Sequence, residues 1–141
     1  MKFKYFEFPL PKPSPVLGNS ILRPIIPIKI SVNGQTAKYD ALIDSGADFC
    51  IFHAELAEYL GIDVQSGLRE VFSGVEDSIG AEAYFHKLIL TVGDKSIKIL
   101  IGFSYDIADH GYGLLGQKGL FDKFLVKFNF LEKEIELTPK K

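Results

Sequence analysis

The sequence predicts an all-β protein, and three observations support this prediction. Many short apolar segments alternate with polar residues, and Gly, Asn-Gly or Gly-Asp turn signals separate them. Beyond single turns, only residues 53–60 have helical spacing. The 141 residues are 47% apolar, which is enough for one buried core. This combination is typical of a barrel or sandwich of short strands.

The N-terminal segment differs in composition from the rest of the chain. Its prolines are Pro9, Pro11, Pro13, Pro15 and Pro24. Because proline fixes φ and lacks a backbone donor, this pattern predicts an extended arm and not a helix. We therefore divide the chain into an arm, residues 1–26, and a domain, residues 27–141. The arm is interpreted as a surface strap or linker; the alternative is a PxxP ligand for a partner, although such short patterns are common by chance.

The first hairpin of the domain has the clearest signal. Apolar residues alternate with polar ones up to Asn33-Gly34, and a partner strand is expected over residues 36–43. A short strand over residues 49–52 follows. Residues 53–60 predict a helix, because Leu56 and Leu60 lie four positions apart and Gly61 can end it.

The remaining elements are predicted as hairpins with one helical turn. Residues 71–74 and 80–85 flank an acidic tip at residues 76–78 and predict a long hairpin. The other predicted elements are a hairpin over residues 88–101 with a turn at Gly93-Asp94, an apolar stretch over residues 112–116, a helical turn over residues 120–124, and an alternating segment over residues 125–137 with a turn at Glu132-Lys133.

One carboxylate stands in a special position. Asp44-Ser45-Gly46-Ala47 follows the apolar run 41–43 and occurs once, so it presents a single Asp on a tight loop after a buried strand. Gly46 allows the tight turn that brings its N–H to the Asp44 carboxylate. Residues 113–116, Gly-Leu-Leu-Gly, repeat the pattern of two apolar residues before a glycine, without the acid. A domain built from two related halves, of which one is catalytic, fits this arrangement.

These motifs, with a glycine-containing hairpin near Gly74, resemble the retropepsins, the single-domain retroviral-type aspartic proteases, in the form found in cellular organisms. The resemblance spans residues 27–137. It implies a closed acid-protease barrel with one or two short helices. It also implies an aspartic endopeptidase that works as a homodimer on an extended peptide or protein substrate. Each chain would contribute one Asp44, and the two carboxylates would share a proton and activate a water without metal or cofactor.

The resemblance also implies roles for the neighbours of Asp44. Ser45 and Gly46 would support the active-site loop. The substrate-binding residues would be Ala47, Asp48, Phe72, Ser73 and Gly74, the last three in a flap that closes over the substrate.

The sequence departs from the family pattern after the second motif. Many retropepsins carry an Arg there that braces the loop, and this chain has Gln117 followed by Lys118. Either Lys118 substitutes for the Arg or the brace is absent, and the role of Asp48 depends on the answer. The alternative function is therefore a non-catalytic peptide-binding or dimerisation module on the same fold.

Composition argues against several other classes of protein. The net charge is −2 with no basic stripe, so no nucleic-acid partner is expected. No apolar run approaches the ~20 residues that span a bilayer, and no signal-peptide core is evident, so we expect a cytoplasmic protein. The single cysteine, Cys50, excludes an intrachain disulfide and fits a buried apolar role better than a nucleophile paired with His53.

Metal binding is not expected either. His53, His86 and His110 show no metal-ligand spacing. Asp44 and Asp48 could share a divalent cation, but two carboxylates on one loop are weak evidence for such a site.

Overall fold

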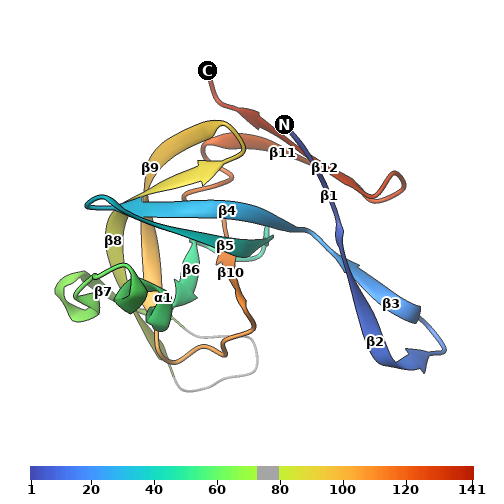
Figure 1. Ribbon diagram of the computed structural model, residues 1–141, viewed down its shortest axis with the longest axis horizontal. Coiled ribbons are helices and arrows are strands. Elements are labelled where there is room, and N and C mark those ends of the chain that lie inside the picture. Colours follow the sequence, from blue (N-terminus) through green and yellow to red (C-terminus); the bar gives the residue numbers. More distant parts are fainter. Residues whose placement is uncertain (73–79) are drawn as a thin grey trace.

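The computed structural model describes residues 1–72 and 80–141, and nearly all regular structure in them is β (Figure 1). The strands are β1 (Lys2–Lys4), β2 (Phe6–Ser14), β3 (Gly18–Arg23), β4 (Ile25–Val32), β5 (Gln35–Ile43), β6 (Ile51–His53), β7 (Leu68–Phe72), β8 (Ala81–Val92), β9 (Lys95–Ser104), β10 (Tyr112–Leu115), β11 (Phe124–Asn129) and β12 (Glu134–Pro139). A short helix, α1 (Ala54–Tyr59), and a 3₁₀ turn, η1 (Val64–Ser66), complete the described elements.

The main sheet closes on itself. Its strand order is β4-β5-β10-β6-β9-β8-β7, and β4 also pairs with β8, so the first six strands form a barrel. The pairs β5–β10 and β6–β9 are parallel, whereas β4–β5, β10–β6 and β8–β9 are antiparallel. The interior is filled by fully buried side chains, among them Ile26, Ile30, Leu90, Ile101 and Phe103. Closure removes exposed strand edges from this core, and the predicted all-β closed barrel is confirmed.

The strand connections follow their local sequence. The β4–β5 hairpin turns at Asn33 and Gly34, both with positive φ (48° and 80°), as the Asn-Gly signal predicts. The β8–β9 hairpin turns at Gly93 (φ 60°). Strands β7 and β8 pair from Leu68–Phe85 to Phe72–Ala81, and the predicted acidic tip of this hairpin lies outside the described residues.

The single described α-helix begins and ends where the sequence predicts. His53 caps it by accepting a 3.2 Å hydrogen bond from the Glu55 N–H to Nδ1, and Gly61 follows with φ 75°. Residues 120–124 form the predicted helical turn, because the backbone N–H groups of Lys123 and Phe124 donate to the Leu120 carbonyl oxygen at 3.0 and 2.9 Å, and β11 begins at Phe124. Gly119 precedes this turn with φ 116°, and a Cβ there would come within 2.8 Å of Cys50 Sγ. No helix in the described residues has the length and apolar character needed to cross a bilayer.

The N-terminal segment contains more structure than an extended arm. Strand β1 pairs with β12, which pairs with β11, and Phe3 and Tyr5 pack against the core. Residues 6–23 then form the β2–β3 hairpin, which extends away from the barrel (Figure 1). Pro9 lies directly opposite Ser20 in this hairpin. This pairing was not predicted, because prolines weaken a strand prediction by removing backbone donors.

Candidate active site

Asp44 lies at the end of two parallel strands. Strand β5 runs beside β10 with Ile43 opposite Leu115, and the Asp44 N–H donates a 2.9 Å hydrogen bond to the Leu115 carbonyl oxygen. The strand ladder therefore fixes the main chain of Asp44 directly. Asp44 as a whole residue is half-buried.

The Asp44 carboxylate is held by its own loop. The Gly46 N–H donates to Asp44 Oδ1 at 2.9 Å, and the Ala47 N–H donates to the Asp44 carbonyl oxygen at 3.2 Å. A Cβ at position 46 would lie 3.3 Å from Oδ1, so a side chain there would crowd the carboxylate. This backbone donor therefore orients the carboxylate within its own loop.

The second motif packs directly against this loop. A Cβ on Gly116 would lie 2.4 Å from the Phe49 carbonyl oxygen and 2.6 Å from that of Ala47, so only glycine fits. The next two backbone N–H groups, of Gln117 and Lys118, donate to the carbonyl oxygens of Ala47 (2.8 Å) and Asp48 (2.9 Å). The two motifs, far apart in sequence, thus form one hydrogen-bonded unit.

Gln117 braces the loop itself, a possibility that neither sequence alternative, Lys118 as the brace or no brace at all, included. Its side-chain Nε2 donates a 2.6 Å hydrogen bond to the Ser45 carbonyl oxygen, at the top of the Asp44 loop. Lys118 contributes through its main chain. Asp48 is exposed, and Ser45 and Gly46 are exposed at the surface of the loop. Sequence reasoning missed Gln117 because the amide contacts a backbone oxygen and not a partner side chain.

Phe49 connects the loop to the β7–β8 hairpin. Its ring meets Phe72 edge-on at 5.6 Å between centroids and Phe85 at 4.8 Å. Beside it is a mainly apolar hollow of about 270 Å³ lined by Phe49, Leu68, Glu70, Phe85, Leu100 and Lys118. Phe72 therefore lies near the loop, whereas Ser73 and Gly74, also predicted in the flap, lie outside the described residues.

A larger hollow than the one beside Phe49 lies away from Asp44. It measures about 570 Å³ and lies over β4 and β5, where Lys29 and Lys38 are among its lining residues. We place the candidate site at Asp44 because the hydrogen bonds of the two motifs hold its carboxylate in a fixed position. The volume of a hollow does not by itself identify a reactive group.

Cys50 is part of the core beneath the loop. It is fully buried, and burial raises the pKa of its thiol to about 11. Because the thiolate is the nucleophilic form, this environment disfavours the Cys50–His53 pair as a catalytic unit.

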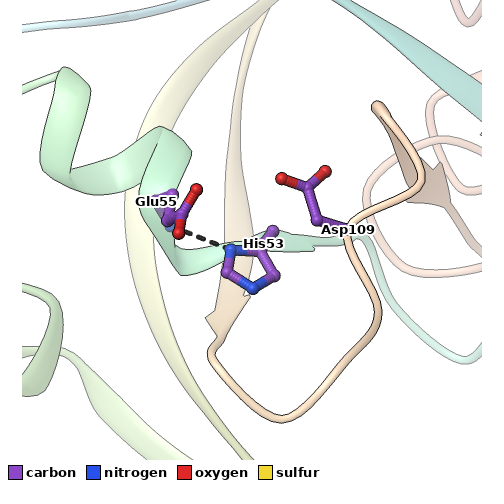
Figure 2. A group of neighbouring side chains, drawn as sticks. All are labelled: His53, Glu55 and Asp109. Carbon is purple, nitrogen blue, oxygen red and sulfur yellow. Dashed lines mark hydrogen bonds between the residues drawn. The ribbon is translucent and has the colours of Figure 1, made fainter.

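A second group of polar side chains could in principle hold a metal ion. His53, Glu55 and Asp109 each offer a ligand atom within 4.8 Å of the others (Figure 2). Sequence spacing did not reveal the group, because Asp109 comes from a distant loop. Two of its atoms already have partners: His53 Nδ1 accepts from Glu55 N–H, and Asp109 Oδ1 accepts from Gly111 N–H at 3.0 Å. Glu55 and Asp109 are exposed, and we assign no metal to this group.

Comparison with known proteins gives a consistent result. The family model described as aspartyl protease matches residues 28–118. A retropepsin-like aspartic protease from Rickettsia conorii has a similar structure, with a TM-score of 0.55 and 20% identity over 80% of this chain and 87% of that one. EIAV protease, in complex with the inhibitor HBY-793, gives a TM-score of 0.45 and 19% identity over 67% and 82% of the two chains. No curated protein sequence matches.

The closed all-β barrel therefore has the retropepsin-like fold. The family match covers well over half of the chain, including Asp44 and Gly116, and the chain therefore belongs to the aspartyl protease family.

Proposed function

We propose that this chain is an aspartic endopeptidase that acts as a homodimer, with Asp44 of each chain in one shared site. The observation that carries the proposal is the Asp44 loop itself. Its carboxylate is oriented by Gly46 N–H, and its main chain is fixed by Leu115 and braced by Gln117. The Gly46 contact alone is one that a turn-capping Asp also makes, whereas the contacts with Leu115 and Gln117 join the loop to the second motif. Because the motif occurs once in the chain, a two-carboxylate site needs a second chain.

The chemistry explains why two carboxylates are needed. At about 3 Å separation they cannot both ionise, so they share one proton and titrate as a pair. The ionised carboxylate takes a proton from a water that attacks the peptide carbonyl. The protonated one donates a hydrogen bond to the carbonyl oxygen as negative charge develops there. In this proposal the two Asp44 carboxylates supply both steps.

The substrate in this proposal is an extended peptide. Ala47 and Asp48 would contact it from the loop. Asp48 is exposed, and the carbonyl oxygens of both residues accept hydrogen bonds from the backbone N–H groups of Gln117 and Lys118, which follow β10 in the chain. Phe72, with Ser73 and Gly74, would contact it from the flap. The cytoplasmic location stays a prediction.

The test is Asp44→Asn, with Asp94→Asn in the exposed β8–β9 turn as the matched control. Asp44→Asn should abolish cleavage of a peptide library while sedimentation shows the same assembly, and Asp94→Asn should cleave as the wild type does. Excess Asp44→Asn chain mixed with wild-type chain should suppress cleavage, because mixed dimers lack one carboxylate. Cleavage that survives in Asp44→Asn would overturn the role of Asp44. Peptide binding without cleavage by the wild type would favour the non-catalytic module.

A further inference from the structure

The β2–β3 hairpin, here called the arm hairpin (residues 6–23), is amphipathic. Phe6 and Phe8 lie two residues apart on β2, with ring centroids at 4.6 Å, and Ile21 of β3 lies directly opposite Phe8. In a strand, residues two apart and directly opposite residues share a face. One face of the arm hairpin therefore carries these three apolar side chains, with Arg23 directly opposite Phe6. The other face carries Leu22 directly opposite Glu7, whose carboxylate accepts a 2.7 Å hydrogen bond from the Ser20 hydroxyl.

The tip of the arm hairpin is also apolar and has a fixed conformation. Val16 is 89% exposed and Leu17 is 59% exposed. Their backbone N–H groups both donate to Ser14 Oγ at 3.1 Å, which orders the turn and leaves the two side chains pointing outward from it. Turns usually carry polar residues, so two adjacent exposed aliphatic side chains mark a contact surface.

Nothing in the described part of the chain covers this apolar surface. Strands β2 and β3 make their extensive contacts only with each other, and Figure 1 shows the hairpin extending away from the barrel. An isolated two-stranded hairpin is marginally stable in water at best. A partner that buries the apolar face would supply the missing stabilisation.

A second group of exposed apolar side chains lies at the C-terminal turn, beside the base of the arm hairpin. Tyr5, which precedes Phe6, meets Phe130 edge-on at 5.5 Å between ring centroids. Phe130 is 62% exposed and Leu131, next to it in the β11–β12 turn, is 93% exposed. Exposed apolar groups thus extend from the arm hairpin to the sheet formed by β1, β12 and β11.

We infer that the arm hairpin is a dimerisation arm, whose apolar face and tip pack against a second copy of this chain. The inference rests on the proposed function, because a site with one Asp44 is incomplete without that copy. A lipid surface fits less well as the partner. The hairpin has two cationic residues, Lys12 and Arg23, and one anionic residue, Glu7, whereas stable binding to anionic lipid requires a basic cluster. The arm begins at β1, so an arm contact would be continuous with the exposed C-terminal turn.

The test measures dimer dissociation constants of the full chain by sedimentation. Two double variants probe the surface: Phe6→Ser with Phe8→Ser on the face, and Val16→Ser with Leu17→Ser at the tip. The tip pair keeps the backbone bonds to Ser14. Tyr59→Ser is the matched control, because Tyr59 is 75% exposed on α1, outside the arm. Both double variants should weaken the dimer at least about tenfold, while Tyr59→Ser leaves it unchanged and all variants keep the wild-type circular dichroism.

The outcomes separate this inference from the proposed function. A dimer that both double variants leave intact would overturn the arm inference, while the Asp44 test could still succeed. Arm-dependent dimerisation without peptide cleavage would support the inference and count against the protease. A wild-type chain that stays monomeric would overturn the inference. The inference would also be overturned if the wild type bound phosphatidylserine-containing vesicles and the double variants lost this binding but still dimerised.

Discussion

At the scale of single residues, Gln117 shows how a loop can be braced without a cation. An Arg offers five donors in a planar fork, and the Gln amide offers two. Here the amide needs only one acceptor, the Ser45 carbonyl oxygen at 2.6 Å, and the Gln117 backbone N–H adds a second contact at Ala47. One residue thus holds the Asp44 loop at two points.

Gln117→Ala should lower kcat by about fivefold with little change in KM, because the loop that orients Asp44 loses one hydrogen bond worth about 1 kcal/mol. Gln117→Arg, which keeps a donor, should restore most of the rate. Gln65→Ala, at an exposed position in η1, is the control. Steady-state kinetics measure both parameters, and equal kcat values for the Ala and Arg variants would show that the side chain does not position the loop.

At the scale of elements, Phe49 couples the active-site loop to the β7–β8 hairpin. Its ring contacts Phe72 at the end of β7 and Phe85 on β8, both edge-on. The parallel bridge between Phe49 and Lys118 fixes the same residue to the segment after the second motif. Packing in this one cluster therefore sets the position of β7 relative to Asp44.

A double-mutant cycle of Phe49→Leu and Phe72→Leu should give a coupling of about 0.5–1.5 kcal/mol in the free energy of unfolding, the usual value for an aromatic pair. Chemical denaturation measures it. Phe72→Leu alone should raise KM more than it lowers kcat, because it loosens the flap strand and not the catalytic loop. As a control, the effects of Phe49→Leu and of Phe128→Leu on β11 on the free energy of unfolding should be additive. A coupling of zero between Phe49 and Phe72 would contradict the role of the cluster.

At the scale of the whole molecule, the barrel and the arm have different tasks. The closed sheet fixes the loop that carries Asp44, and its core is complete within one chain. In the proposed function, the Asp44 site needs a second carboxylate from another chain, and the arm hairpin has apolar side chains that the described part of one chain leaves exposed. Dimerisation would complete both.

Peptidase activity per chain should therefore fall on dilution, with a midpoint at the concentration where sedimentation shows half of the dimer dissociated, since half a site is inactive. A dilution series assayed with a fluorogenic peptide measures this. Constant specific activity at concentrations where the chain is monomeric would show that one chain suffices.

The sequence by itself determined the features that depend on neighbouring residues. The Asn33-Gly34 turn, the strand before Asp44 and the helix between His53 and Gly61 follow from backbone conformations and periodicity that a few residues set. The Asp44 motif was visible for the same reason, since its turn is local.

Only the tertiary structure decided the features that join distant segments. The contact of Gln117 with Ser45 spans 72 positions, and Gly119 packs so closely against Cys50 that a Cβ would lie 2.8 Å from its Sγ. Pairing between β2 and β3 was hidden because prolines weaken a strand pattern without preventing the pairing. Such contacts depend on which segments the closed barrel brings together, and alternation along one strand does not carry that information.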